Sequence, residues 1–310
     1  MKKSLFISEI NRLRIEKNAV IMAHYYQIPE IQDIADFVGD SLALAQEAEK
    51  TTSDIIVVCG VHFMGETAKI LNPQKKVIIP DASAGCSLAN SCPVQEFSKF
   101  VTEHPDHTVV TYVNTTAAVK AFSDITVTST NAKKIIENLP ADQKIIFGPD
   151  KNLGDYINSQ TGRQMLLWDG ACHVHEQFSL EKLLKLKAQF PAAEVLAHPE
   201  CKKPVLMVAD FIGSTAALLN YSAKSEKMQF LVATESGILH QMQKKSPAKK
   251  FIPVPPDDST CACNECNFMR LNTLEKLYEC LCAEKPEILI DEEIRIKAIK
   301  PIKRMLEMSK

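Results

Sequence analysis

The sequence lacks the features that mark nucleic-acid-binding, membrane and exported proteins. Its 310 residues carry 36 Lys and Arg against 38 Asp and Glu, and a net charge of −2 gives no reason to expect nucleic acid or an anionic membrane as a partner. No apolar run is long enough to cross a bilayer. The opening segment MKKSLFISEINRLRIEKN has no sustained apolar stretch and no small-residue cleavage site, so we expect an amphipathic helix and a soluble, cytoplasmic protein.

Two phosphate-binding motifs and all flexible linkers are also missing. The sequence contains neither G-x-G-x-x-G nor G-x-x-x-x-G-K[ST], which argues against dinucleotides and against P-loop chemistry. No Gly/Ser-rich linker or low-complexity tract separates its parts. We therefore expect domains that are joined compactly.

The sequence contains an internal repeat of three similar units. His24, Tyr112 and His198 open the copies, which start 88 and 86 residues apart. Each of these residues stands twelve positions before an aspartate. A serine or threonine follows five positions after the aspartate. An apolar run ends nineteen positions after that hydroxyl residue. The equivalent positions are Asp36, Asp124 and Asp210, then Ser41, Ser129 and Thr215, then Gly60, Gly148 and Thr234.

The order of expected elements is the same in each copy. An apolar strand, a helix, a short strand and a second helix precede a third strand, a third helix, a fourth strand, a cysteine-containing loop and a last helix. Continuous apolar strands that alternate with amphipathic helices are typical of parallel sheets covered on both faces. The sequence thus predicts an α/β protein of three similar three-layer αβα domains, arranged with pseudo-threefold symmetry around a central active site. The expected units are 1–106 with an N-terminal helix, 107–192, and 193–310 with a C-terminal extension.

Polar side chains recur at the ends of the first strands. Residues i and i+2 of a strand project to the same face, and ligands of parallel sheets bind outside the carboxyl ends of the strands. One such pair could simply cap a helix, but three in equivalent positions predict a substrate site. The pairs are His24 with Tyr26, Tyr112 with Asn114, and His198 with Glu200.

The three hydroxyl residues that follow the aspartates are expected to be helix N-caps. Capping contributes about 1 kcal/mol to a helix and needs no ligand to explain it. Helix N-termini are also anion sites, however, and three of them on one axis suit a small substrate with several carboxylates or phosphates. These residues are Ser41, Ser129 and Thr215.

Ten cysteines need an explanation in a reducing cytosol, where structural disulfides are disfavoured. Cys59, Cys280 and Cys282 lie in an apolar strand and a helical stretch, where small buried hydrophobes are the usual interpretation. The other seven lie in loops. They are Cys86, Cys92, Cys172, Cys201, Cys261, Cys263 and Cys266.

A cysteine follows the fourth strand of every unit, at Cys86, at Cys172 and in the run CACNEC at 261–266. Three converging thiolates suit an iron–sulfur cluster that leaves one iron open to act as a Lewis acid. Zinc stays an alternative, either at a local C-x-x-C site in 261–266 or at a mixed site with His173 and His175.

Several long motifs in this order resemble those of the quinolinate synthase family. AHYYQIPEIQDIADFVGDSL at 23–42 is very similar to the family's opening motif, and the likeness runs nearly to RMLEM at 304–308. The shorter matches are YVNTT at 112–116, VTSTNA at 127–132, FGPDKNLG at 147–154, GACHVH at 170–175, HPEC at 198–201 and GST at 213–215.

The resemblance implies three α/β domains around a pseudo-threefold axis, with a [4Fe-4S] cluster held by one cysteine from each. It implies a transferase that condenses iminoaspartate (iminosuccinate) with dihydroxyacetone phosphate to give quinolinate, phosphate and water in de novo NAD biosynthesis. An aspartate-oxidising enzyme is a candidate partner, and the sequence leaves open whether it docks or the imine arrives by diffusion.

Site residues can be carried over by motif. The resemblance implies proton transfer by Tyr26, His198 and Glu200, with His198 near its ordinary pKa and Glu200 active if its surroundings raise its pKa. The implied cluster ligands are Cys86, Cys172 and Cys266. The implied substrate-binding residues are His24, Ser41, Tyr112, Val113, Asn114, Ser129, His198, Pro199, Glu200 and Thr215.

The third thiolate is ambiguous. Counting from the end of the fourth strand favours Cys261, whereas the family's ligand is the cysteine followed by x-x-Met, which is Cys266. We follow the family, because loop lengths drift more readily than local motifs. The spacing C-x-C-x-x-C departs from the relatives' patterns and leaves Cys261 and Cys263 as candidates for a strained redox disulfide.

Two other functions remain open at this point. One is an iron–sulfur or zinc protein that senses metal or redox state without turnover, and the other is a structural-zinc scaffold that only binds metabolites. The three polar pairs favour an enzyme, because a sensor needs no such side chains.

Overall fold

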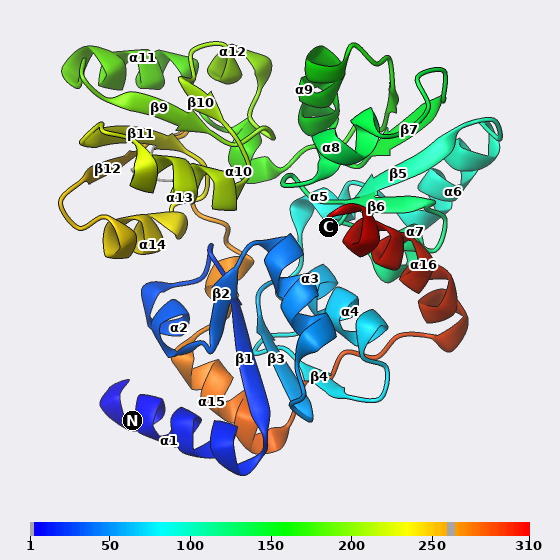
Figure 1. Ribbon diagram of the computed structural model, residues 1–310. Helices are drawn as coiled ribbons and strands as arrows, with labels where there is room; N and C mark the ends of the chain where they lie inside the picture. Colours follow the sequence, from blue (N-terminus) through cyan, green and yellow to red (C-terminus); the bar gives the residue numbers. More distant parts are fainter. Residues whose placement is uncertain (1–2, 259–263) are drawn as a thin grey trace.

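The computed structural model describes residues 3–258 and 264–310, which form three four-stranded sheets with flanking helices (Figure 1). Every pairing within these sheets is parallel, so the predicted αβα units are confirmed. The strands are β1 (Ala19–His24), β2 (Phe37–Gly39), β3 (Ile55–Cys59) and β4 (Lys76–Ile78), then β5 (Thr108–Tyr112), β6 (Ile125–Val127), β7 (Ile145–Gly148) and β8 (Leu166–Leu167), then β9 (Glu194–Ala197), β10 (Phe211–Ile212), β11 (Gln229–Ala233) and β12 (Lys250–Pro253).

Strand order is the same in the three sheets: β2-β1-β3-β4, β6-β5-β7-β8 and β10-β9-β11-β12. From each first strand the chain turns to one side for the second strand and to the other side for the third. Such a reversal opens a crevice at the carboxyl ends of the first and third strands. The fold therefore prepares three equivalent binding positions.

The helices follow the predicted order, and a short turn is added after each of the three loop cysteines. In the part of the chain that the structure describes, no helix has the length and apolar character to cross a bilayer. The helices are α1 (Lys3–Glu16), α2 (Pro29–Ile34), α3 (Ser41–Lys50), α4 (His62–Leu71), α5 (Ser87–Asn90), α6 (Val94–Thr102), α7 (Ala117–Lys120), α8 (Ala132–Glu137), α9 (Lys151–Thr161), α10 (His173–Glu176), α11 (Leu180–Gln189), α12 (Lys203–Leu206), α13 (Thr215–Lys224), α14 (Ile238–Lys245), the 3₁₀ turn η1 (Met269–Leu271), α15 (Leu274–Ala283) and α16 (Glu292–Met308).

The repeated aspartates have a structural role. Asp36 accepts a hydrogen bond of 2.9 Å from the backbone N–H of Ile21, fifteen residues earlier in the first strand. Asp124 and Asp210 accept the same bond in their own units, at 2.8 Å. Each carboxylate fixes the entry of the second strand against the first, which explains the constant spacing in the sequence.

The last helix of each unit covers the sheet of the next. Phe97 of α6 packs on β5 and β7, and Leu183 of α11 packs on β9 and β11. Leu277 of α15 returns to β1 and β3, beside α1. The exchange closes a ring, so each unit completes its core only with a neighbour.

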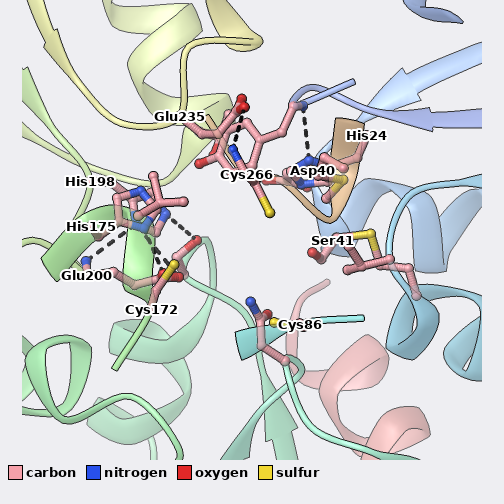
Figure 2. A pocket seen from close by; sticks show the side chains of 18 of the residues that line it. His24, Asp40, Ser41, Cys86, Cys172, His175, His198, Glu200, Glu235 and Cys266 are labelled. Carbon is pink, nitrogen blue, oxygen red and sulfur yellow. Dashed lines mark hydrogen bonds and ion pairs between the residues drawn. The ribbon is translucent and has the colours of Figure 1, made fainter. Parts of the chain in front are cut away.

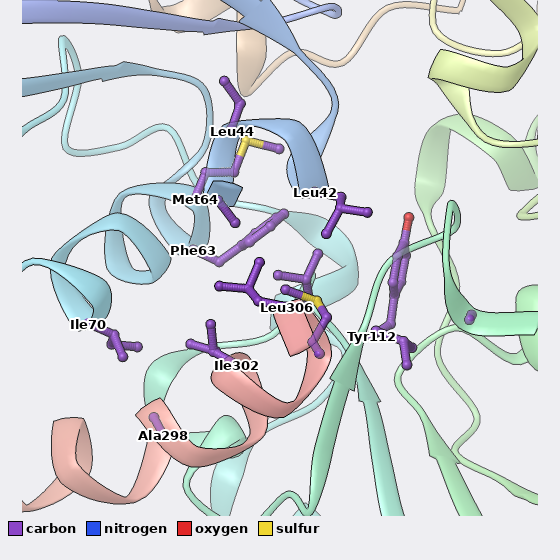
Figure 3. Packing of buried hydrophobic residues seen from close by; sticks show 14 of the residues in the cluster. Leu42, Leu44, Phe63, Met64, Ile70, Tyr112, Ala298, Ile302 and Leu306 are labelled. Atoms are coloured by element: carbon purple, nitrogen blue, oxygen red, sulfur yellow. The ribbon is translucent and has the colours of Figure 1, made fainter. Parts of the chain in front are cut away.

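Helix α16 joins the first two units (Figure 3). Ile302 and Leu306 lie in one continuous core with Phe63 and Met64 of α4 and with Tyr112 of β5. Ile302 is fully buried, and truncating such a side chain to alanine costs about 2–5 kcal/mol. The C-terminal extension therefore holds units one and two together.

Candidate active site

One pocket lies where the three units meet, at the carboxyl ends of the first strands (Figure 2). The cavity volume open to water-sized molecules is about 60 Å³, well below that of cavities that hold drug-sized ligands. Most of the residues expected from the sequence line it together: His24, Tyr26, Ser41, Cys86, Tyr112, Asn114, Ser129, Cys172, His198, Glu200, Thr215 and Cys266.

The two repeat histidines are held in the same way. The backbone N–H of Tyr26 donates to Nδ1 of His24 at 3.1 Å, and that of Glu200 donates to Nδ1 of His198 at 3.3 Å. Burial lowers the pKa of both imidazoles to about 3, because water no longer solvates the cation. Both are neutral rings whose proton lies on Nε2. The expectation that His198 keeps its ordinary pKa is therefore wrong.

Glu200 lies between two partners. It accepts a hydrogen bond of 2.5 Å at Oε1 from the Tyr112 hydroxyl, and its Oε2 lies 2.9 Å from Nδ1 of His175. The second contact is a close polar contact, and Nδ1 of His175 makes no hydrogen bond. Burial raises the pKa of Glu200, but the neighbouring His175 and the Tyr112 hydroxyl outweigh it and hold the pKa below its usual range. The condition of a raised pKa is not met, and Glu200 is a carboxylate.

The Tyr26 phenol crosses from the first unit to the third. Its Oη lies 2.7 Å from the Thr215 hydroxyl and 2.8 Å from the Thr234 hydroxyl. Burial raises the pKa of Tyr26 well above its ordinary value, so it is a hydrogen-bond donor and not a phenolate.

The predicted N-caps are displaced by one or two residues, so that expectation is wrong. Asp40 caps α3 by accepting from the N–H of Ala43, and Ser214 caps α13 in the same way from Ala217. Both cap residues precede the hydroxyl residue of the repeat. Ser41 and Thr215 are the first residues of their helices and line the pocket, since a neighbour already does the capping.

Unit two departs further from the expected cap. Ser129 lies before Asn131, the N-cap residue of α8, and its hydroxyl lies 3.2 Å from Nε2 of His198. All three hydroxyl residues of the repeat therefore line the pocket instead of capping their helices.

Asn114 lines the pocket, and its buried Oδ1 has no hydrogen-bond partner in the structure. Such an atom is costly to leave unpaired and is available to a ligand. The loop that carries it is held by Lys120, whose buried ammonium donates to the carbonyls of Val113 and Thr115. Val113 and Pro199 are buried beside the pocket but do not line it.

Cys86, Cys172 and Cys266 are free thiols whose sulfur atoms face the same open space in Figure 2. Burial raises the pKa of all three, to about 12 for Cys86, while backbone N–H groups of the turns that follow them act in the opposite direction. Two carboxyl groups support the loops, because Asp150 and Glu235 accept from the N–H of Cys172 and Cys266 at 3.2 Å.

The comparisons with known proteins agree with this geometry. The family described as quinolinate synthetase A protein matches residues 8–307. The quinolinate synthase of Chloroherpeton thalassium is 59% identical over 302 residues, covering 97% of this chain and 94% of the relative. That of a Synechocystis species is 60% identical over 303 residues, covering 98% and 95%.

The chain belongs to the quinolinate synthase family. The cysteine of the family's motif, which is Cys-Asn-Phe-Met in this chain, is Cys266, and it lines the pocket. Cys261 and Cys263 lie outside the described residues, so the choice of Cys266 over Cys261 and the disulfide stay predictions. Cys92 and Cys201 are buried away from the pocket, and the Cys201 thiol donates to the Ala233 carbonyl.

A second arrangement of donors is present. Three residues, Cys172, His175 and Glu200, each offer one ligand atom, and these atoms lie within 4.8 Å of one another. This group could hold a metal ion. His173, the other histidine considered for a mixed zinc site, instead contacts the Ser87 hydroxyl at 2.6 Å and does not line the pocket.

Sequence reasoning missed several residues of the site. Asp40 lines the pocket and accepts from Thr130 of unit two, and Glu235 lines it from unit three. His175 was considered only as a zinc ligand. A preference for aspartate at N-caps could have identified Asp40, but only the fold brings Glu235 and His175 to the pocket.

Proposed function

We propose that this chain condenses iminoaspartate (iminosuccinate) with dihydroxyacetone phosphate to form quinolinate, phosphate and water, as a transferase of de novo NAD biosynthesis in the cytoplasm. The observation that carries the proposal is the shared pocket, where a member of this family gathers three thiols and three pairs of polar side chains. Small anionic substrates suit it, because its donors are neutral and its volume is modest.

The donor set fits a [4Fe-4S] cluster held by Cys86, Cys172 and Cys266. Three buried thiols that face one space are unfavourable as three free thiolates but suit a cationic centre, which deprotonates its sulfur ligands. When bound, such a cluster supplies an open iron that is a Lewis acid toward a substrate hydroxyl or carboxylate.

The chain's own residues bind and orient the substrate. His24 and His198 present Nε2 to the pocket as neutral donors, which can hold carboxylate oxygens without a charged ring. The Ser41 hydroxyl and the unpaired amide of Asn114 add polar contacts on the other walls. Together these groups fix the ends of a polyanionic substrate relative to the thiols.

Proton transfer falls to Glu200 and Tyr26. Glu200 is a buried, ionised carboxylate that can accept a proton in tautomerisation and ring closure, and its lowered pKa makes it a weak base. Tyr112 donates a hydrogen bond to Glu200 and holds its carboxylate in place. Tyr26 has a protonated phenol and is the corresponding donor on the unit-one side.

An anaerobic assay with oxaloacetate, ammonia and dihydroxyacetone phosphate tests the proposal, with quinolinate as the measured product. We expect a brown protein that contains iron and sulfide and forms quinolinate. A colourless protein with zinc and no iron would rule out the cluster. A brown protein without turnover would favour a redox or metal sensor. Adding an aspartate-oxidising enzyme with aspartate in place of oxaloacetate and ammonia tests that enzyme as the source of the imine.

A further inference from the structure

One position in the short helix after each first strand lies eight residues beyond the residue that opens its unit. It holds Gln32 of α2, Lys120 of α7 and Leu206 of α12. Gln32 and Lys120 are both buried, and a lysine is almost never fully buried without partners. Two buried polar side chains at equivalent positions of the repeat need an explanation.

In unit one, Gln32 holds the loop that presents Tyr26 to the pocket. Its amide nitrogen donates to the carbonyl of Tyr25 at 2.9 Å and to that of Gln27 at 2.7 Å. The same nitrogen lies 2.9 Å from the carbonyl of Gly237 in unit three. Three carbonyls around one end of the amide identify that end as the nitrogen, because the amide oxygen cannot donate. The carbonyls on either side of Tyr26 therefore share one buried donor.

In unit two, Lys120 does the same for Asn114. Its ammonium donates to the carbonyl of Val113 at 2.8 Å and to that of Thr115. The ammonium also lies 5.5 Å from the centre of the Phe63 ring of unit one, a favourable cation–π distance. Burial lowers the pKa of Lys120 to about 8, so the side chain is still charged near neutral pH. The carbonyls on either side of Asn114 thus share one buried donor as well.

Unit three offers no donor at the equivalent position. Leu206 is half-buried there and packs against the apolar core of its own unit. The fold therefore accepts leucine at this position of the repeat, and the hydrogen bonds made by Gln32 and Lys120 are not needed to form the helix.

We propose that Gln32 and Lys120 are positioning residues, which hold the loops after β1 and β5 so that Tyr26 and Asn114 face the pocket before a ligand binds. A residue between two anchored carbonyls has little freedom to turn, so its side chain keeps one direction. The inference rests on the proposed function, in which Tyr26 is a donor and Asn114 binds substrate. The alternative is that both side chains only stabilise the fold.

Leucine variants remove each donor in the cluster-loaded, full-length protein. Lys120→Leu should raise KM about threefold to tenfold with little change in kcat, because Asn114 binds substrate and transfers no proton. Gln32→Leu should lower kcat about tenfold to a hundredfold with little change in KM, because Tyr26 is displaced. Wild-type kinetics in either leucine variant would overturn the proposal.

The repeat also supplies a variant that restores the donor. Lys120→Gln places the unit-one side chain in unit two and should return KM most of the way to the wild-type value. A KM as high as that of Lys120→Leu would contradict the proposal.

Two controls separate positioning from stability. Val119→Ala truncates a buried side chain of the same helix that packs with Phe97, so it should lower the free energy of unfolding and leave KM unchanged. Adding Lys120→Leu to Asn114→Ala should raise KM no further, because the lysine acts through the asparagine. A raised KM in Val119→Ala, or additive effects in the double variant, would contradict the proposal.

Hydrogen exchange in the cluster-free, full-length protein tests the loops without turnover. We expect faster exchange at residues 113–116 in Lys120→Leu and at residues 25–28 in Gln32→Leu, each with the other loop unchanged. Wild-type exchange of these loops in both variants would overturn the proposal. If the loops respond as expected but the wild-type protein forms no quinolinate, the proposed function is wrong and the two residues still hold their loops.

Discussion

The first strands of units one and three end alike and then diverge. In both, a neutral histidine accepts at Nδ1 from the backbone N–H two residues later, and burial lowers its pKa to about 3. That later residue is Tyr26 in unit one and Glu200 in unit three. The repeated backbone fixes where a side chain enters the pocket, and one substitution decides whether that place holds a donor or a base.

The largest effect is expected when one unit loses the thiol that it contributes to the pocket. Cys266→Ala should abolish cluster assembly, because two cysteines leave the iron without a third anchor, whereas Cys261→Ala should leave it intact. Iron and sulfide content and the visible absorption after anaerobic reconstitution check this result. The reverse outcome would show that counting along the repeat was the better guide.

The difference between the two strand ends predicts unequal losses of activity. Glu200→Gln should keep the cluster and lower kcat by about a hundredfold to ten-thousandfold, because an amide cannot accept a proton as a base. Tyr26→Phe should lower kcat less, since Glu200 and Tyr112 stay in place. Steady-state kinetics with matched iron content provide the comparison. Normal turnover in Glu200→Gln would remove Glu200 from the chemistry.

Capping and binding can be separated at α13. Ser214→Ala removes the cap and should lower the free energy of unfolding by about 1 kcal/mol, with KM unchanged. Thr215→Val leaves the cap and should raise KM, because Thr215 lines the pocket. Urea unfolding and substrate titration distinguish them. A loss of stability with unchanged KM in Thr215→Val would restore the original N-cap interpretation of Thr215.

The smallest predicted effect concerns the connection between the units. Glu284, after α15, contacts Lys17 and Lys76 of unit one, and these hydrogen bonds lower its pKa to about 2. A lowered carboxyl pKa stabilises the fold above the unfolded pKa, and this stabilisation is lost as pH falls toward the folded pKa.

Glu284→Gln should therefore cost on the order of 1 kcal/mol at about pH 7 and less at about pH 3.5. Urea unfolding at both pH values measures the difference. An equal cost at both would mean that the charge of Glu284 contributes nothing.

Local pattern was enough to predict the elements, the parallel sheets and most of the pocket residues. Strand-end pairs such as His198 and Glu200 could be placed because side chains alternate along a strand and parallel strands share one edge. The N-caps were misplaced because serine, threonine and aspartate all cap helices, and the sequence around Asp40 and Ser214 offers two adjacent candidates. Only the observed hydrogen bonds distinguish them.

The sequence by itself determined the repeated unit, the order of its elements along the chain and the set of thiols and polar side chains. Only the tertiary structure decided that His198 is neutral, that Glu200 is ionised and that Thr234 joins Tyr26 to His175. The physical reason is that protonation and hydrogen-bond direction depend on burial and on partners from other units. These partners come from all three units and are far apart in the chain until the ring of units closes.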